Sequence, residues 1–155
     1  MKRYLFLILI FGLSLSCWGQ SLQWTSFEHL NDSLRNQPKP ILVFIEAEWC
    51  KFCKLQDNVT FQDAELVALL NEEFYCLRFD GEGKDDLTFI NRTYAYNPST
   101  GYHKLAEILG KKDGKVAFPT TVLLHSNLQN TQRLQGLQPS KYLINDLKLF
   151  LSTAP

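Results

Sequence analysis

The chain alternates between short apolar runs and segments in which apolar residues recur every three or four positions. Continuous runs rich in β-branched and aromatic residues predict strands at 41–45, 74–79, 120–125 and 131–134. Helical spacing predicts helices at 50–71, 85–94, 103–109 and 140–151, and residues 24–36 are predicted to form a short strand or turn that leads into a helix. Within 50–71 we expect a break near residues 60–63, where Asp63 is placed to cap a second helical segment.

The order of these elements predicts the fold class. Strands that alternate with helices favour one α/β domain, in which a central sheet has helices on both faces. The last two strands lie close together in the sequence, so we expect them to form an antiparallel hairpin and the sheet to be mixed. We assign this single domain to residues 20–155.

Residues 1–19 have the layout of a secretory signal peptide. Lys2 and Arg3 precede an apolar run over 4–15, and small residues follow it. The run is too short for a membrane span, which needs about 20 apolar residues. We therefore expect an exported, periplasmic protein. Two alternatives would anchor it to the membrane: an uncleaved leader, or a lipoprotein leader that ends before Cys17.

Composition narrows the range of partners. The chain has 155 residues, of which 45% are hydrophobic and 21% charged, as in soluble globular proteins. Its 16 basic and 16 acidic residues balance, so no nucleic-acid partner is indicated. We expect a monomer.

The number of cysteines bears on their pairing. Export would remove Cys17 with the leader and leave three of the four cysteines. An odd number indicates one close pair and a single thiol rather than a fully paired set of structural disulfides.

Cys50 and Cys53 carry the chemistry that the sequence indicates. They lie where a buried strand meets a helix, so Cys50 would occupy the helix N-terminus, where the helix dipole favours a thiolate. Cys50 would then attack a substrate disulfide, and Cys53 would resolve the mixed disulfide. Two alternatives remain, a purely structural disulfide and half of a zinc site. The other zinc ligands would have to come from scattered residues, namely Cys76, His29, His103 and His125.

Several short motifs resemble those of thioredoxins. They are Ile41-Leu42-Val43 followed by Ala47-Glu48-Trp49-Cys50, then Phe118-Pro119-Thr120-Thr121, and a later glycine, Gly136. The similarity covers residues 24–151. Within the family, Glu48-Trp49-Cys50 and Thr60-Phe61-Gln62-Asp63 are similar to the thioredoxin-like domains of bacterial periplasmic proteins. One of these is the C-terminal domain of the transmembrane disulfide reductase.

This resemblance implies a thioredoxin fold and a thiol–disulfide oxidoreductase without metal or organic cofactor. It also implies that Pro119 is cis and packs against the cysteine pair, that Phe118 offers backbone groups to a substrate, and that Trp49 borders the same surface. The substrates would be disulfides or thiols of exported proteins, with a membrane protein as electron donor. The segment 82–104 is longer than a thioredoxin needs, and would be an extended loop and helix that either recognises a partner or packs onto the domain.

Two departures from the family bear on activity. Phe44 stands where thioredoxins usually have a buried acid, so we hypothesise that Glu46 accepts the proton of Cys53. The alternative is that Glu46 is a solvent-facing acid at the end of the strand. Strongly oxidising members of the family often have a histidine between the two cysteines. The dipeptide Lys51-Phe52 has none, and this absence favours a reductase. A disulfide oxidase or isomerase with the same residues, and a non-catalytic binding module, are the competing functions.

Overall fold

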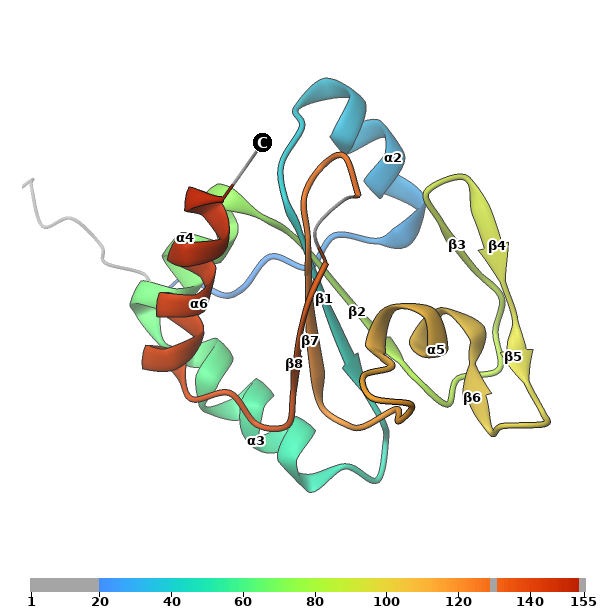
Figure 1. The fold of residues 1–155 in the computed structure, drawn as a ribbon. Coiled ribbons are helices and arrows are strands. Elements are labelled where there is room, and N and C mark those ends of the chain that lie inside the picture. The colour runs from blue at the N-terminus through green and yellow to red at the C-terminus, as the bar shows by residue number, and fades with distance from the viewer. Residues whose placement is uncertain (1–19, 129–130, 154–155) are drawn as a thin grey trace, which may run out of the picture.

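The computed structural model describes residues 20–128 and 131–153, and its centre is a four-stranded mixed sheet (Figure 1). The strands are β1 (Ile41–Glu46), β2 (Tyr75–Asp80), β7 (Thr120–Leu124) and β8 (Gln132–Gln135), in the order β2-β1-β7-β8. Strand β1 is parallel to β2 and antiparallel to β7, and β8 is antiparallel to β7. The predicted mixed sheet with a final hairpin is confirmed.

Helices cover both faces of the sheet, as predicted (Figure 1). One face carries α3 (Lys51–Asn58), α4 (Ala64–Glu73) and α6 (Ser140–Ser152), and the other carries α2 (Phe27–Asn36) and α5 (Lys104–Gly110). Side chains of β1 alternate between the two cores, because successive strand residues point to opposite faces. Leu42 and Phe44 belong to the core under α3, α4 and α6, whereas Ile41, Val43 and Ile45 belong to the core under α2 and α5.

The predicted break in the helical segment after Cys50 is also present. Helix α3 ends at Asn58, a 3₁₀ turn follows at Thr60–Gln62 (η1), and α4 begins after Asp63. The carboxylate of Asp63 accepts a hydrogen bond of 3.1 Å from the backbone N–H of Leu66, which caps α4. This bond favours the charged carboxylate and lowers the pKa of Asp63 below its ordinary value.

The helix predicted over 85–94 is wrong. This segment forms a hairpin of β3 (Leu87–Phe89) and β4 (Arg92–Tyr94), and a second small hairpin of β5 (Tyr96–Asn97) and β6 (Tyr102–His103) follows. Residues 87–89 alternate apolar and polar, which is the period of a strand. Ile90 and Asn91 both have positive φ, so the chain turns sharply there instead of continuing as a helix. The extra segment is therefore two hairpins, not a loop and helix.

Residues 1–19, including the predicted signal peptide and Cys17, lie outside the described residues. Among the residues that the structure describes, no helix is long and apolar enough to cross a membrane.

Cys76 is the single thiol of the described chain, and it is only 1% exposed. It lies within β2 and forms an isolated bridge with Trp24. Burial disfavours the charged thiolate and raises the pKa of Cys76 to about 12.

We predict that Cys76 stays unmodified in the folded protein. At pH 8 a thiol with this pKa is ionised to only about one part in ten thousand, and the thiolate is the reactive form. Iodoacetamide followed by peptide mass mapping should label Cys76 only in denaturant. An exposed thiol introduced as Lys111→Cys is the control and should react in the native state. Native labelling of Cys76 at the rate of this control would contradict the prediction.

Candidate functional site

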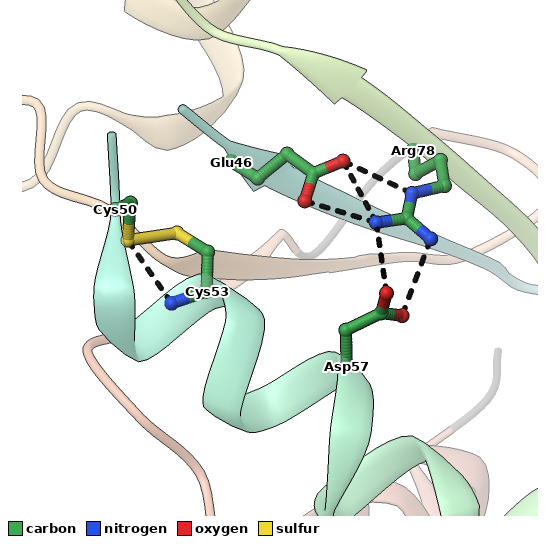
Figure 2. Close-up of polar contacts among 5 residues, drawn as sticks. All are labelled: Glu46, Cys50, Cys53, Asp57 and Arg78. Carbon is green, nitrogen blue, oxygen red and sulfur yellow. Dashed lines mark hydrogen bonds and ion pairs between the residues drawn. A yellow bond between two sulfur atoms is a disulfide. The ribbon is translucent and has the colours of Figure 1, made fainter. Parts of the chain in front are cut away.

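Cys50 and Cys53 form a disulfide at the N-terminus of α3, with an S–S distance of 2.15 Å (Figure 2). Strand β1 ends at Glu46, and a short turn then places Cys50 as the N-cap, its N–H donating to the carbonyl of Ala47 at 3.0 Å. The Sγ of Cys50 accepts a hydrogen bond of 3.0 Å from the backbone N–H of Cys53. The predicted pairing at a strand–helix junction is confirmed.

Position, not exposure, distinguishes the two cysteines. In the disulfide form Cys50 is 2% and Cys53 1% exposed. Cys50 precedes the helix, where unpaired N–H groups and the positive end of the dipole stabilise a negative sulfur, whereas Cys53 lies inside the first turn. The exposed side chains of Lys51 and Lys54 add positive charge at the same end. This arrangement suits a thiolate on Cys50.

A charged network lies beside the disulfide and was not predicted. Arg78 of β2 donates to both carboxylate oxygens of Glu46, at 2.8 and 2.9 Å from Nη2, and pairs with Asp57 of α3 at 3.2 Å (Figure 2). Its guanidinium also lies 4.9 Å from the ring of Trp24. Burial lowers the pKa of Arg78, but hydrogen bonds and charge from Glu46 and Asp57 outweigh this, so its pKa is raised.

Glu46 is therefore an ion-paired side chain and not a free acid at the strand end. Figure 2 shows its carboxylate turned toward Arg78, and within the described residues no hydrogen bond joins it to either cysteine. Its role as proton acceptor stays a prediction. Phe44 is fully buried, with its ring centroid 5.0 Å from that of Phe61, so an apolar contact fills the position where thioredoxins usually have an acid. The signal that was overlooked was Arg78, the one charged residue within the strand predicted over 74–79.

The residues predicted to bind substrate lie together. The peptide bond Phe118–Pro119 is cis, as predicted, and Pro119 is buried. Trp49 is 67% exposed, and its ring meets that of Phe118 edge to face at 6.1 Å. Gly136, whose φ is positive, donates its backbone N–H to the carbonyl of Pro119 at 2.7 Å.

The segment 82–104 reaches this surface through two side chains that sequence reasoning did not assign. Glu82 accepts a hydrogen bond of 2.8 Å from the indole N–H of Trp49. The ring of Tyr102 lies 6.0 Å from that of Phe118. Neither contact leaves a periodic signal in the sequence, because each joins residues that are distant along the chain.

The histidines do not join the cysteine pair. His103 is buried and caps α5, its Nδ1 accepting from the N–H of Leu105 at 3.2 Å, and His125 stacks on Phe150 at 4.0 Å. Across residues 20–128 and 131–153, no group of three or more His, Cys, Asp or Glu side chains is placed to hold a metal ion.

Comparison with known proteins gives both a family and a fold. A family model described as thioredoxin-like matches residues 23–102. Spermatogenesis-associated protein 20 of Mus musculus is 30% identical over 70 residues, which are 45% of this chain and 9% of that protein. The thiol:disulfide interchange protein DsbD of Campylobacter jejuni is 38% identical over 42 residues, which are 27% of this chain and 7% of that protein. The matches thus span less than a tenth of these relatives.

Solved structures extend the likeness to most of the chain. A DsbH oxidoreductase has a TM-score of 0.61 at 16% identity, with 90% of this chain and 91% of that chain covered. The C-terminal domain of Neisseria meningitidis DsbD, in its reduced form, has a TM-score of 0.52 at 18% identity, with 77% and 88% covered. Identities this low establish the fold alone. The family model covers residues 23–102, which is more than half of the sequence, and the chain therefore belongs to the thioredoxin-like family.

Proposed function

We propose that this protein is a reductase of disulfides in exported proteins. The observation that carries the proposal is the Cys50–Cys53 disulfide at the N-terminus of α3, where the Sγ of Cys50 accepts a backbone hydrogen bond. A sulfur in that position is stabilised as a thiolate, which is the form that attacks disulfides. A disulfide needed only for stability would gain nothing from this placement.

The reaction begins with the reduced pair. The Cys50 thiolate attacks one sulfur of a substrate disulfide, forms a mixed disulfide and releases the other substrate sulfur as a thiolate. Cys53 then loses its proton and attacks the Sγ of Cys50, which frees the second substrate sulfur. Two electrons pass to the substrate, its two sulfurs take up the proton of Cys53 and one proton from solvent, and the Cys50–Cys53 disulfide remains. A dithiol of a membrane electron donor would reduce it again.

Direction and location are part of the same proposal. The dipeptide Lys51-Phe52 without histidine and the likeness to part of DsbD support reduction. The leader over 1–19 would direct the protein to the periplasm, where an uncleaved leader or a lipid on Cys17 would anchor it to the membrane, and we propose that it works there as a monomer. Export to that oxidising compartment would supply disulfide substrates. The oxidase or isomerase and the binding module are the competing functions.

The redox potential separates reductase from oxidase. We predict that the Cys50–Cys53 couple, equilibrated with glutathione and quantified by alkylation and mass spectrometry, lies below about −200 mV. A value between about −120 and −180 mV would instead identify an oxidase or isomerase. Cys76, buried and un-ionised, should contribute nothing to this measurement, and Cys76→Ala should leave the potential unchanged.

Trapping tests the division of labour between the two cysteines. We predict that Cys53→Ser accumulates mixed disulfides with exported proteins, because Cys50 attacks and nothing resolves the product. The matched variant Cys50→Ser should accumulate far fewer, and a reductant should release the partners for identification by mass spectrometry. If Cys50 of the reduced protein resists alkylation at neutral pH, the protein is a binding module and not an oxidoreductase.

The proton acceptor is tested by Glu46→Gln. If Glu46 takes the proton of Cys53, this variant should reduce a disulfide about tenfold or more slowly at pH 7, and the deficit should shrink at higher pH. Glu48→Gln, an exposed acid two residues further on, is the control and should leave the rate unchanged. Asp57→Asn also removes a partner of Arg78. Equal slowing by Asp57→Asn and Glu46→Gln would show that Glu46 acts only by holding Arg78, and an unchanged rate in Glu46→Gln would exclude any role.

A further inference from the structure

Three aromatic rings from separate parts of the chain form a row that includes the residue before Cys50. Trp49 precedes Cys50, Phe118 precedes the cis-proline, and Tyr102 belongs to β6 within the extra segment. Phe118 is the middle ring, 6.1 Å from Trp49 and 6.0 Å from Tyr102, with tilted, near edge-to-face contacts on both sides. We call Trp49, Phe118 and Tyr102 the aromatic row.

Close packing holds the middle of the row in place. The ring of Phe118 lies so close to Gly81 that a Cβ added there would stand 2.4 Å from its Cε1 atom. The same ring packs against the cores on both faces of the sheet. The ring of Phe118 therefore has little room to rotate.

The extra segment holds both ends of the row. Glu82 fixes the indole of Trp49 with a hydrogen bond of 2.8 Å. At the other end the neighbour of Tyr102, His103, donates its backbone N–H to the carbonyl of Gly81 at 2.7 Å, which ties β6 to the chain beneath Phe118. The segment 82–104 thus helps to position Trp49, which precedes Cys50, and Tyr102, in addition to packing on the domain.

The row is open to a partner. Trp49 is 67% exposed, and Phe118 and Tyr102 are half-buried. Within the described residues the backbone N–H and carbonyl of Phe118 have no hydrogen-bond partner, so they are available to an extended peptide. A peptide whose cysteine reached Cys50 would lie against these rings, because Trp49 adjoins Cys50 in the chain.

We propose that the extra segment makes the redox site selective for disulfides in which a large apolar or aromatic side chain neighbours the reacting cysteine. Tyr102 is the specificity-determining residue, because it extends the apolar surface beyond the two rings that the cysteine motif and the proline loop supply. The inference rests on the proposed function, and deepens it by naming the class of substrate.

Two matched peptide disulfides test the selectivity. They are identical except that the residue next to the cysteine is Phe in one and Ser in the other. Pre-reduced protein is mixed with each peptide, the reaction is quenched with acid, and the second-order rate constant is measured by mass spectrometry. The wild type should react about three- to tenfold faster with the Phe peptide, the gain expected from one added aromatic contact.

Variants show whether Tyr102 sets this preference. Tyr102→Ala should bring the ratio close to one, and Tyr102→Phe should preserve it. Tyr94→Ala is the matched control, because Tyr94 lies in the same segment and its ring contacts Arg92 rather than Phe118. All four proteins should react equally fast with hydroxyethyl disulfide, which has no side chain for the row to bind.

The outcomes separate this inference from the proposed function. Reaction with hydroxyethyl disulfide but equal rates with the two peptides would overturn the selectivity and leave the oxidoreductase intact. A loss in Tyr102→Ala that is the same for both peptides and accompanies a lower melting temperature would show a structural role only, and would also overturn it. No reaction with any disulfide would remove the proposed function and the inference with it.

Discussion

The structure depends on the burial of β1 on both faces. All five residues from Ile41 to Ile45 are fully buried, and their alternation links the two cores. Because β1 lies between β2 and β7, its carboxyl end is fixed by hydrogen bonds on both sides. The chain leaves this fixed end at Glu46 and reaches Cys50, the N-cap of α3, four residues later, so the N-terminus of α3 is positioned by the central strand β1. The disulfide, which lies at this N-terminus, is therefore also positioned by β1.

Charge near the disulfide is arranged differently from what the family resemblance implies. A buried acid at position 44 would lie opposite Arg78, since these two residues are partners in the β1–β2 register. Here Phe44 fills the apolar space, and Arg78 finds its two carboxylates further out, on Glu46 and Asp57. The three side chains join β1, β2 and α3, and they are about one quarter to one third exposed, so they avoid the full desolvation cost of a buried ion pair. The fold thus keeps acidic groups beside the redox helix without burying a lone carboxylate in its core.

The sequence was sufficient where a local pattern dictates structure. The buried strand 41–45, the helix start at Cys50, the cap at Asp63 and the cis bond before Pro119 were all predicted, because each has a short signature or a family motif. The hairpin over 87–94 was missed because its strands are only three residues each and its turn is formed by Ile90 and Asn91, which lack a glycine. The two carboxylates that pair with Arg78, the contact of Glu82 with Trp49 and the contact of Tyr102 with Phe118 were missed for another reason. Contacts between side chains remote in sequence depend on the finished fold, and no periodicity reports them.

Gly81 links the segment 82–104 to the central sheet. Its N–H donates to the carbonyl of Glu46 at 2.7 Å, and its carbonyl accepts from the N–H of His103, also at 2.7 Å. The end of β1 and the end of β6 are thus joined through one residue, and only a residue without a Cβ leaves room for the ring of Phe118. Tyr102 is therefore positioned by backbone bonds to the strand that also positions the disulfide. A loop attached only by its ends would lack these two backbone hydrogen bonds, which fix the position of β6 relative to the end of β1.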